Sequence, residues 1–392
     1  MPVNNLTFNQ LSTILNGIQS QVTGASAIAP VNTSEFVSVA QSVLKTGADP
    51  VMSAISQILG RTIFSVRPYS AKFKGLLMDN QRWGGITRKI NYVDKSFTDD
   101  SGFSLTDGQA VDQYIVNKPE VIQTNYYGSN VYQKSVTIFR DQLDTAFSGV
   151  NEFGEFISGV MQNISDQIEQ AHEDTGRMTI ANLVGGIIAA QKANQIVHLL
   201  TEYNALTGKK LTANTVYAPE NYKPFMLWVY SRIAKASAML TERSQLYHFN
   251  LTGKPIQRHS PVNRQRLYLY ADARYQTEAQ VLADTYHDNY LSFGETETVN
   301  YWQSIEFPAK IQVKPVYFKE ADGSIVTAAD NVTQDNIFAV IMDEEAAGMN
   351  IFNYELAATP YNARGRYTNM WWSFNERYFN DFTENAMVFL LD

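Results

Sequence analysis

The histidines are candidate site residues, because imidazole is a common metal ligand and general base. The 392-residue chain contains five, and no two of them stand four residues apart: His172, His198, His248, His259 and His287. A zinc-peptidase helix needs two histidines at that spacing, so His172-Glu173 alone does not make one. The sequence also lacks cysteine, which excludes disulfides, thiolate catalysis and cysteine metal sites.

Three short motifs resemble fragments of known sites. Asp174-Thr175-Gly176 has the form of an aspartic-peptidase loop, but that chemistry needs two carboxylates that share a proton, and there is no second copy. We interpret this triplet as the end of a helix, where Gly is a usual stop. Gly208-Lys209-Lys210 and Gly253-Lys254-Pro255 lack the upstream glycine of a phosphate-binding loop. No Gly-x-Ser-x-Gly nucleophile elbow is present.

One basic group could meet phosphate, and it comprises Arg258, His259, Arg264 and Arg266. Since acidic residues are plentiful elsewhere in the chain, a solvated loop is the favoured interpretation of this group. The sequence therefore predicts no catalytic, cofactor-binding or metal-binding residues, and no enzyme. An enzyme whose site these motifs do not reveal stays an alternative.

The composition describes a chain that can bury much surface. Its length suggests two or three compact units. Hydrophobic residues make up 44% and charged residues 18%, and there are 22 Tyr, 21 Phe and 5 Trp. Aromatic side chains contribute strongly to interfaces and to cores. The composition thus favours a subunit that packs against partners, although a large core in a monomer would explain it equally well.

Net charge and hydropathy limit the classes of partner that the chain can bind. The net charge of −8 argues against a protein whose whole surface binds nucleic acid, while leaving room for one local face. The chain opens Met1-Pro2-Val3 without a basic, apolar signal peptide, so we expect synthesis in the cytoplasm. The longest run of small apolar residues, 180–190, contains Asn182 and two glycines and is too short to cross a bilayer. We therefore expect no membrane partner.

Hydrophobic periodicity predicts the elements that organise the chain. Helices are predicted at 11–22, 36–44, 50–59, 151–173, 178–203, 224–247 and 278–289. Strands are predicted at 86–93, 131–139, 266–271, 311–318, 337–342, 349–356, 367–378 and 386–391. Gly185-Gly186 is expected to weaken the helix that contains it. A turn is predicted at Asp322-Gly323.

The segment between the first two strands is unusually long. We interpret 131–139 as the strand that returns along 86–93, with a polar stretch at 99–108 between them. A two-stranded excursion of this kind is not stable in water alone. We therefore expect this excursion to lie on another surface, and a neighbouring copy of the chain is the obvious candidate. The short helices of residues 1–60 are likewise expected to form an arm that lies on another part of this chain or on a neighbouring subunit.

The order of arm, extended excursion, long helix and mixed α/β region resembles the major capsid protein of tailed bacteriophages, which has the Hong Kong 97 fold. Within that family, the chain is most similar to the capsid proteins of the short-tailed phi-twenty-nine-like podophages. The residues that carry this resemblance are Arg266-Leu267-Tyr268-Leu269-Tyr270-Ala271-Asp272-Ala273, Phe338-Ala339-Val340-Ile341-Met342-Asp343, Gly365-Arg366-Tyr367 and Met370-Trp371-Trp372-Ser373-Phe374.

The resemblance implies an α+β, Hong Kong 97-like capsid fold. Its implied parts are an N-terminal helical arm at 1–71, an extended two-stranded loop (E-loop) at 72–148, the spine helix and first part of the peripheral domain at 149–213, the axial domain at 214–345, and closing strands that return to the peripheral domain at 346–392. Residues 337–342 would complete the axial sheet, and residues 370–378 would run beneath the spine helix.

The function that the resemblance implies is mechanical. Copies of the chain would form pentamers and hexamers of an icosahedral head that encloses packaged double-stranded DNA, contacted non-specifically at its inner surface. A scaffolding protein and a portal are the further partners implied, and the virion is the implied location after synthesis in the host cytoplasm. The shell of an encapsulin-type cellular nanocompartment is an alternative with the same fold.

Overall fold

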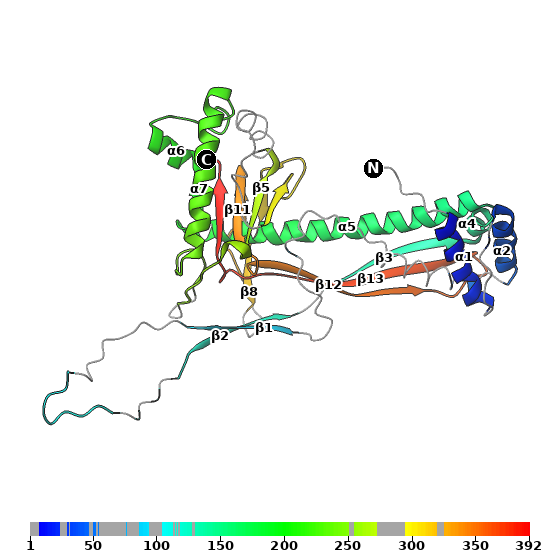
Figure 1. Ribbon diagram of the computed structural model, residues 1–392, viewed down its shortest axis with the longest axis horizontal. Coiled ribbons are helices and arrows are strands. Elements are labelled where there is room, and N and C mark those ends of the chain that lie inside the picture. The colour runs from blue at the N-terminus through cyan, green and yellow to red at the C-terminus, as the bar shows by residue number, and fades with distance from the viewer. Residues whose placement is uncertain are drawn as a thin grey trace.

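The chain folds into an elongated molecule with a compact block at one end and a helical cluster at the other (Figure 1). The computed structural model describes residues 8–23, 30, 32–46, 50–51, 54, 76, 86–93, 104–112, 114, 116, 118–127, 130–250, 255–272, 295–319 and 325–392. A long helix and a three-stranded sheet join the two ends, and a two-stranded hairpin projects from the block (Figure 1).

The joining helix is α5 (Val150–Ala189), a single helix of 40 residues that is about 60 Å long. The prediction of two helices here is wrong, as is the placement of Asp174-Thr175-Gly176 at a helix end, because this triplet lies inside α5. Thr175, Gly176 and Arg177 are buried. Tertiary packing against the neighbouring sheet therefore overrides the low helix propensity of glycine.

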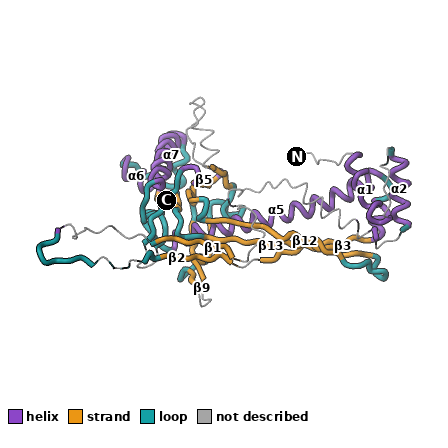
Figure 2. The backbone as a smooth tube through the Cα atoms, turned by 60° about the horizontal axis from the view of Figure 1, so that its bottom comes forward, coloured by secondary structure: helices purple, strands orange, loops and turns teal. Residues whose placement is uncertain are grey.

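The three-stranded sheet lies along α5 (Figures 1 and 2). It is antiparallel, in the order β12 (Ala347–Ala358), β13 (Tyr367–Asn380), β3 (Asn130–Phe139). Met370, Trp372 and Phe374 on alternate positions of β13 are buried in the core shared with the first half of α5. This arrangement confirms that the aromatic segment 370–378 runs beside the long helix.

The predicted pairing of 131–139 with 86–93 is wrong. The hairpin instead pairs β1 (Ile86–Tyr92) with β2 (Val121–Tyr127), while β3 pairs with β13 over its full length. Alternate residues of β3, including Tyr132 and Ile138, bury against the sheet and helices, with the Tyr132 and Phe374 rings stacked 5.5 Å apart. That partner is distant in sequence, so local alternation could not identify it.

The compact block is built on a five-stranded sheet in the order β4 (Ile196–His198), β14 (Ala386–Leu390), β11 (Ile337–Asp343), β5 (Gln265–Tyr270), β6 (Glu295–Val299). Strand β11 is central and all seven of its residues are buried, which explains its unbroken apolar sequence. One face of the sheet packs against α6 (Leu199–Thr207) and α7 (Pro219–Thr241), and the other packs against the last part of α5.

The opposite end of the molecule is a helical cluster. Helices α1 (Phe8–Thr23), α2 (Thr33–Lys45) and α4 (Arg140–Ala146) share one core with the start of α5. The Phe36 and Phe153 rings lie 5.6 Å apart, and Phe147 lies 5.1 Å from Phe153. The predicted arm therefore packs on its own chain. Of the helix predicted from Pro50, residues 50–51 and 54 are described and are helical.

Short strands complete the described structure. They are β7 (Ile311–Val313), β8 (Val316–Lys319), β9 (Ile325–Thr327) and β10 (Val332–Gln334), with a 3-10 turn η3 (Val262–Arg264) before β5. The strand predicted at 311–318 is divided at Pro315, which lacks the amide hydrogen that a sheet ladder needs. The predicted helix 278–289 and the turn at Asp322-Gly323 lie outside the described residues.

Candidate functional site: the projecting hairpin and its charged junction

The projecting hairpin has two different faces. Directly opposed residues of an antiparallel pair share a face, and the β1–β2 register pairs Lys89 with Thr124 and Asn91 with Ile122. Asn91 and Ile122 are buried, 7% and 8% exposed, so these residues face the block. We call this side the body face. It attaches the hairpin to its own chain.

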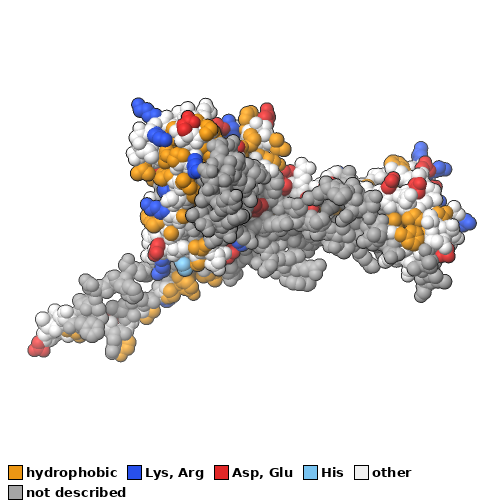
Figure 3. Space-filling view, turned by 45° about the horizontal axis from the view of Figure 1, so that its top comes forward, with side chains coloured by type: hydrophobic (Ala, Val, Ile, Leu, Met, Phe, Trp, Pro, Cys, Tyr) orange, Lys and Arg blue, Asp and Glu red, His pale blue; other side chains and the backbone are white. Residues whose placement is uncertain are grey.

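The other side, which we call the open face, carries large apolar side chains in contact with solvent. Ile90 is 52% exposed, Tyr92 67% and Val121 46%. Exposed apolar residues continue in the described part of the segment between the strands: Leu105, Val111, Tyr114 and Val116. Figure 3 shows hydrophobic side chains on this projecting part of the molecule. An apolar surface held out in water is a candidate contact for a protein partner.

The body face ends in a buried ion cluster centred on Lys89. The Lys89 ammonium lies 2.8 Å from Asp381 Oδ2 and 3.0 Å from Glu345 Oε2, and it also pairs with Glu384. Asp381 and Glu384 belong to the connection between β13 and β14, and Glu345 follows β11. The ammonium thus joins the hairpin to two connections of the block.

The Lys89 cluster favours the charged forms of its central pair. Burial lowers the pKa of Lys89, but the carboxylates of Asp381 and Glu384 outweigh it and hold this pKa above its ordinary value. Burial likewise raises the pKa of Asp381, and the Lys89 ammonium outweighs it and holds this pKa below its ordinary value. The pair is therefore charged throughout the physiological pH range.

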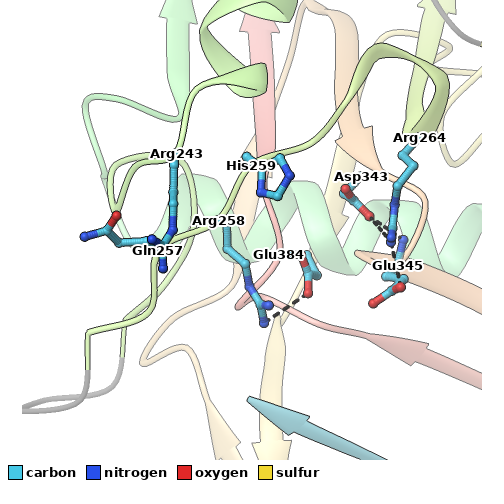
Figure 4. A pocket seen from close by; sticks show the side chains of 8 residues that line it. All are labelled: Arg243, Gln257, Arg258, His259, Arg264, Asp343, Glu345 and Glu384. Atoms are coloured by element: carbon cyan, nitrogen blue, oxygen red, sulfur yellow. Dashed lines mark hydrogen bonds and ion pairs between the residues drawn. The ribbon is translucent and has the colours of Figure 1, made fainter. Parts of the chain in front are cut away.

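Two arginines complete the cluster. Arg258 donates to Asn91 Oδ1 at 3.0 Å and pairs with Glu384 at 3.0 Å, while Arg264 lies 2.6 Å from Glu345 and 3.2 Å from Asp343. We call the whole set the charged junction, and it comprises Lys89, Arg258, Arg264, Asp343, Glu345, Asp381 and Glu384. A cavity of about 330 Å³ beside it is lined by Arg243, Gln257, Arg258, His259, Arg264, Asp343, Glu345 and Glu384 (Figure 4). The charged groups of the junction bind one another, so the junction is built to hold structure.

The basic group singled out in the sequence contributes to this junction. Its interpretation as a solvated loop is wrong for Arg258, Arg264 and Arg266, because each forms an ion pair with a carboxylate. The partners of Arg264 and Arg266 lie in the acidic turn 343–345, which is visible in the sequence as a cluster of opposite charge. Lys89, Asp381 and Glu384 carried no local signal.

The histidines are dispersed in the structure as in the sequence. His172 and His248 are buried in different parts of the molecule, His198 lies 2.7 Å from Asp392, and His259 lines the cavity. His287 lies outside the described residues. Within the described residues, no group of three His, Asp or Glu side chains could hold a metal ion. Over the same residues, no helix combines the length and the apolar character needed to cross a membrane.

The fold matches that of phage shell proteins. The capsid structure of Staphylococcus phage Andhra matches with a TM-score of 0.50 and 10% identity, over 82% of this chain and 84% of that chain. A chain in the structure of the head fiber and inner core protein gp22 of native bacteriophage P68 matches with a TM-score of 0.54 and 10% identity, over 82% and 85%. The architecture is thus the Hong Kong 97-like capsid fold.

A family comparison gives the more specific assignment. The model of the Phi29-like phage major capsid protein family matches residues 11–390, so the chain belongs to that family. It is therefore a structural protein of a tailed-phage virion and not an enzyme. This membership decides between the phage capsid and the two alternatives, the nanocompartment shell and the enzyme. No curated protein sequence matches the chain.

Proposed function

We propose that copies of this chain form the pentamers and hexamers of an icosahedral head, and that the β1–β2 hairpin of each copy lies over the adjacent copy. The observation that carries this proposal is the open face, where Ile90, Tyr92 and Val121 are exposed on a projecting ribbon. A two-stranded ribbon needs a surface to cover its apolar residues. A second copy supplies that surface repeatedly in a closed shell.

The packing supports the proposed division of the chain. The core of α1, α2, β3, β13 and the first half of α5 corresponds to the arm and the peripheral domain, proposed at 1–71, 149–213 and 346–392. Most of the two cores on either side of the five-stranded sheet comes from the axial domain, proposed at 214–345, and α6 and the last part of α5, from the segment 149–213, contribute to them as well. Strand β14 extends this sheet from within the closing segment, and the E-loop at 72–148 supplies β3 to the peripheral sheet.

The remaining proposed partners are a scaffolding protein, a portal and packaged double-stranded DNA. The exposed side of α5 is unsuited to phosphate, because it carries Glu152, Glu155, Asp166 and Asp174, while Arg177, the one Lys or Arg of α5, is buried. Non-specific contact with DNA therefore belongs to other elements of the inner surface. Synthesis in the host cytoplasm precedes incorporation into the virion.

The open face can be tested at Tyr92. Tyr92→Ser removes a large exposed ring and leaves the body face unchanged, so the subunit should melt at the parent temperature. We expect the fraction of protein that sediments as closed shells to fall about tenfold, as for loss of a central aromatic contact. Tyr92→Phe keeps the apolar ring and should assemble like the parent. Equal assembly of all three proteins would refute the proposed contact.

A further inference from the structure

The hairpin is attached to the block at more than one point on the same strand. Lys89 and Asn91 are two residues apart on β1, so both point to the body face and stand about 7 Å apart. Lys89 enters the group of three carboxylates, Glu345, Asp381 and Glu384. Asn91 accepts a hydrogen bond from Arg258 at 3.0 Å.

Strand β2 adds a third contact to the same region. Tyr126 Oη donates to Asp381 Oδ2 at 2.7 Å, and its ring lies 4.5 Å from the ring of Phe379. Asp381 therefore receives one donor from each strand of the hairpin, namely Lys89 and Tyr126. A ribbon held at a single point can pivot about it, whereas contacts from both strands fix its direction.

The ion pairs favour one placement of the hairpin relative to the block, the one in which Lys89 lies among the carboxylates. The ammonium of Lys89 has three donors, and three carboxylates surround it. The side chains of Lys89, Asp381 and Glu384 are 18%, 3% and 7% exposed, so these three groups are largely shielded from water, whereas Glu345 at 39% lies at the exposed edge of the cluster. Glu384 and Glu345 also pair with Arg258 and Arg264. Moving Lys89 away would therefore chiefly leave the buried Asp381 carboxylate without its ammonium partner, and an unpaired buried charge is strongly unfavourable.

We propose that Lys89, with Arg258 and Asn91, forms a latch that fixes the direction in which the hairpin leaves the block. In this role Lys89 is a positioning residue, because it holds the open face at the angle at which an adjacent copy meets it. The angle itself is a property of the single chain. Only its consequence for assembly rests on the proposed function.

The absence of cysteine permits a direct measurement of this angle. Gln123 on the open face and Lys235 on α7 are both exposed. Gln123→Cys and Lys235→Cys introduced together provide two unique sites for spin labels, and pulsed electron paramagnetic resonance then reports the distance between hairpin and block in the unassembled full chain. We expect a single narrow distance distribution in this labelled parent.

Three further substitutions in the labelled chain test the latch. Lys89→Met should broaden the distance distribution at least twofold, and Lys89→Arg, which keeps the cation, should leave it narrow. Asn91→Ser, which shortens the acceptor of Arg258 without leaving a charge unpaired, should broaden it as well. The control is Arg232→Met, which breaks the 2.6 Å ion pair with Glu202 inside the block and should not broaden it.

The outcomes separate this inference from the proposed function. An unchanged narrow distribution in Lys89→Met and Asn91→Ser would overturn the latch, and so would loss of folding in both Lys89→Met and Lys89→Arg. If the latch fails while Tyr92→Ser still blocks assembly, the proposed function stands. If Lys89→Met broadens the distribution and Tyr92→Ser assembles normally, the latch stands and the proposed contact fails.

Discussion

At the residue scale, a buried carboxyl between β13 and α5 stands out. Glu376 is fully buried, and its Oε2 accepts a hydrogen bond from Thr175 Oγ1 at 3.1 Å. Burial raises the pKa of Glu376 from 4.5 to about 7, partly opposed by the Thr175 hydrogen bond. The same interface buries His172, whose ring meets the ring of Phe374 edge-on at 5.2 Å. The joint between long helix and sheet therefore contains a group that titrates near neutral pH.

The raised pKa of Glu376 predicts a pH-dependent stability. Between pH 4.5 and about 7 the folded state retains a proton that the unfolded state has lost, so the free energy of unfolding falls as pH rises through this range. The full loss approaches about 3 kcal/mol and is complete above pH 7. Glu376→Gln should remove this loss. Between pH 5 and pH 8, the free energy of unfolding of the variant, measured with urea, should therefore rise relative to that of the parent. Identical pH profiles for the two proteins would contradict the assignment.

The roles of the residues in the charged junction could not be predicted from the sequence. Lys89 meets Asp381 and Glu384, which are 292 and 295 residues away in the chain. No spacing rule joins positions so distant, because only the strand pairing brings them together. The acidic turn 343–345 and the arginines near 258–266 were visible as charge clusters, yet nothing local indicated that they pair.

At the element scale, the glycines of α5 show why the sequence was only partly informative. Gly185-Gly186 was predicted to weaken the helix, but α5 continues through both. A Cβ atom on Gly186 would lie 2.4 Å from Phe382, and one on Gly185 would lie 2.3 Å from Val313. These glycines therefore allow close packing of the helix against the block, and helix propensity alone does not reveal that requirement.

This close packing predicts opposite effects for two matched substitutions in α5. Gly186→Ala places a methyl group against the buried Phe382 ring, and overpacking should destabilise the chain by about 1–3 kcal/mol. Gly159 is exposed with nothing within 4 Å of an added Cβ, so Gly159→Ala should stabilise by about 0.5–1 kcal/mol. Urea unfolding of both variants measures these effects. Equal stabilisation by both would show that the close approach does not constrain the helix.

At the scale of the whole molecule, the order of elements was predictable and the strand pairing was not. The buried strand β11, the aromatic strand β13 and the amphipathic first part of α5 were each evident from local patterns, and the structure confirms them. The return strand of the hairpin was misassigned because no strand was predicted at 121–127, so 131–139 was the next strand along the chain. The structure pairs β3 with β13 instead, and β2 is the strand that returns along β1.

The most direct test of the account compares shell formation by the full chain with that of a chain lacking residues 99–112. Each is expressed alone and with a scaffolding protein, and electron microscopy and sedimentation score closed shells. The full chain should form uniform closed shells, and the shortened chain should melt at the same temperature yet stay unassembled, because it has lost the end of the hairpin and kept the charged junction. A full chain that is monomeric under every condition, or a shortened chain that cannot fold, would contradict the central claim that the hairpin is an assembly element.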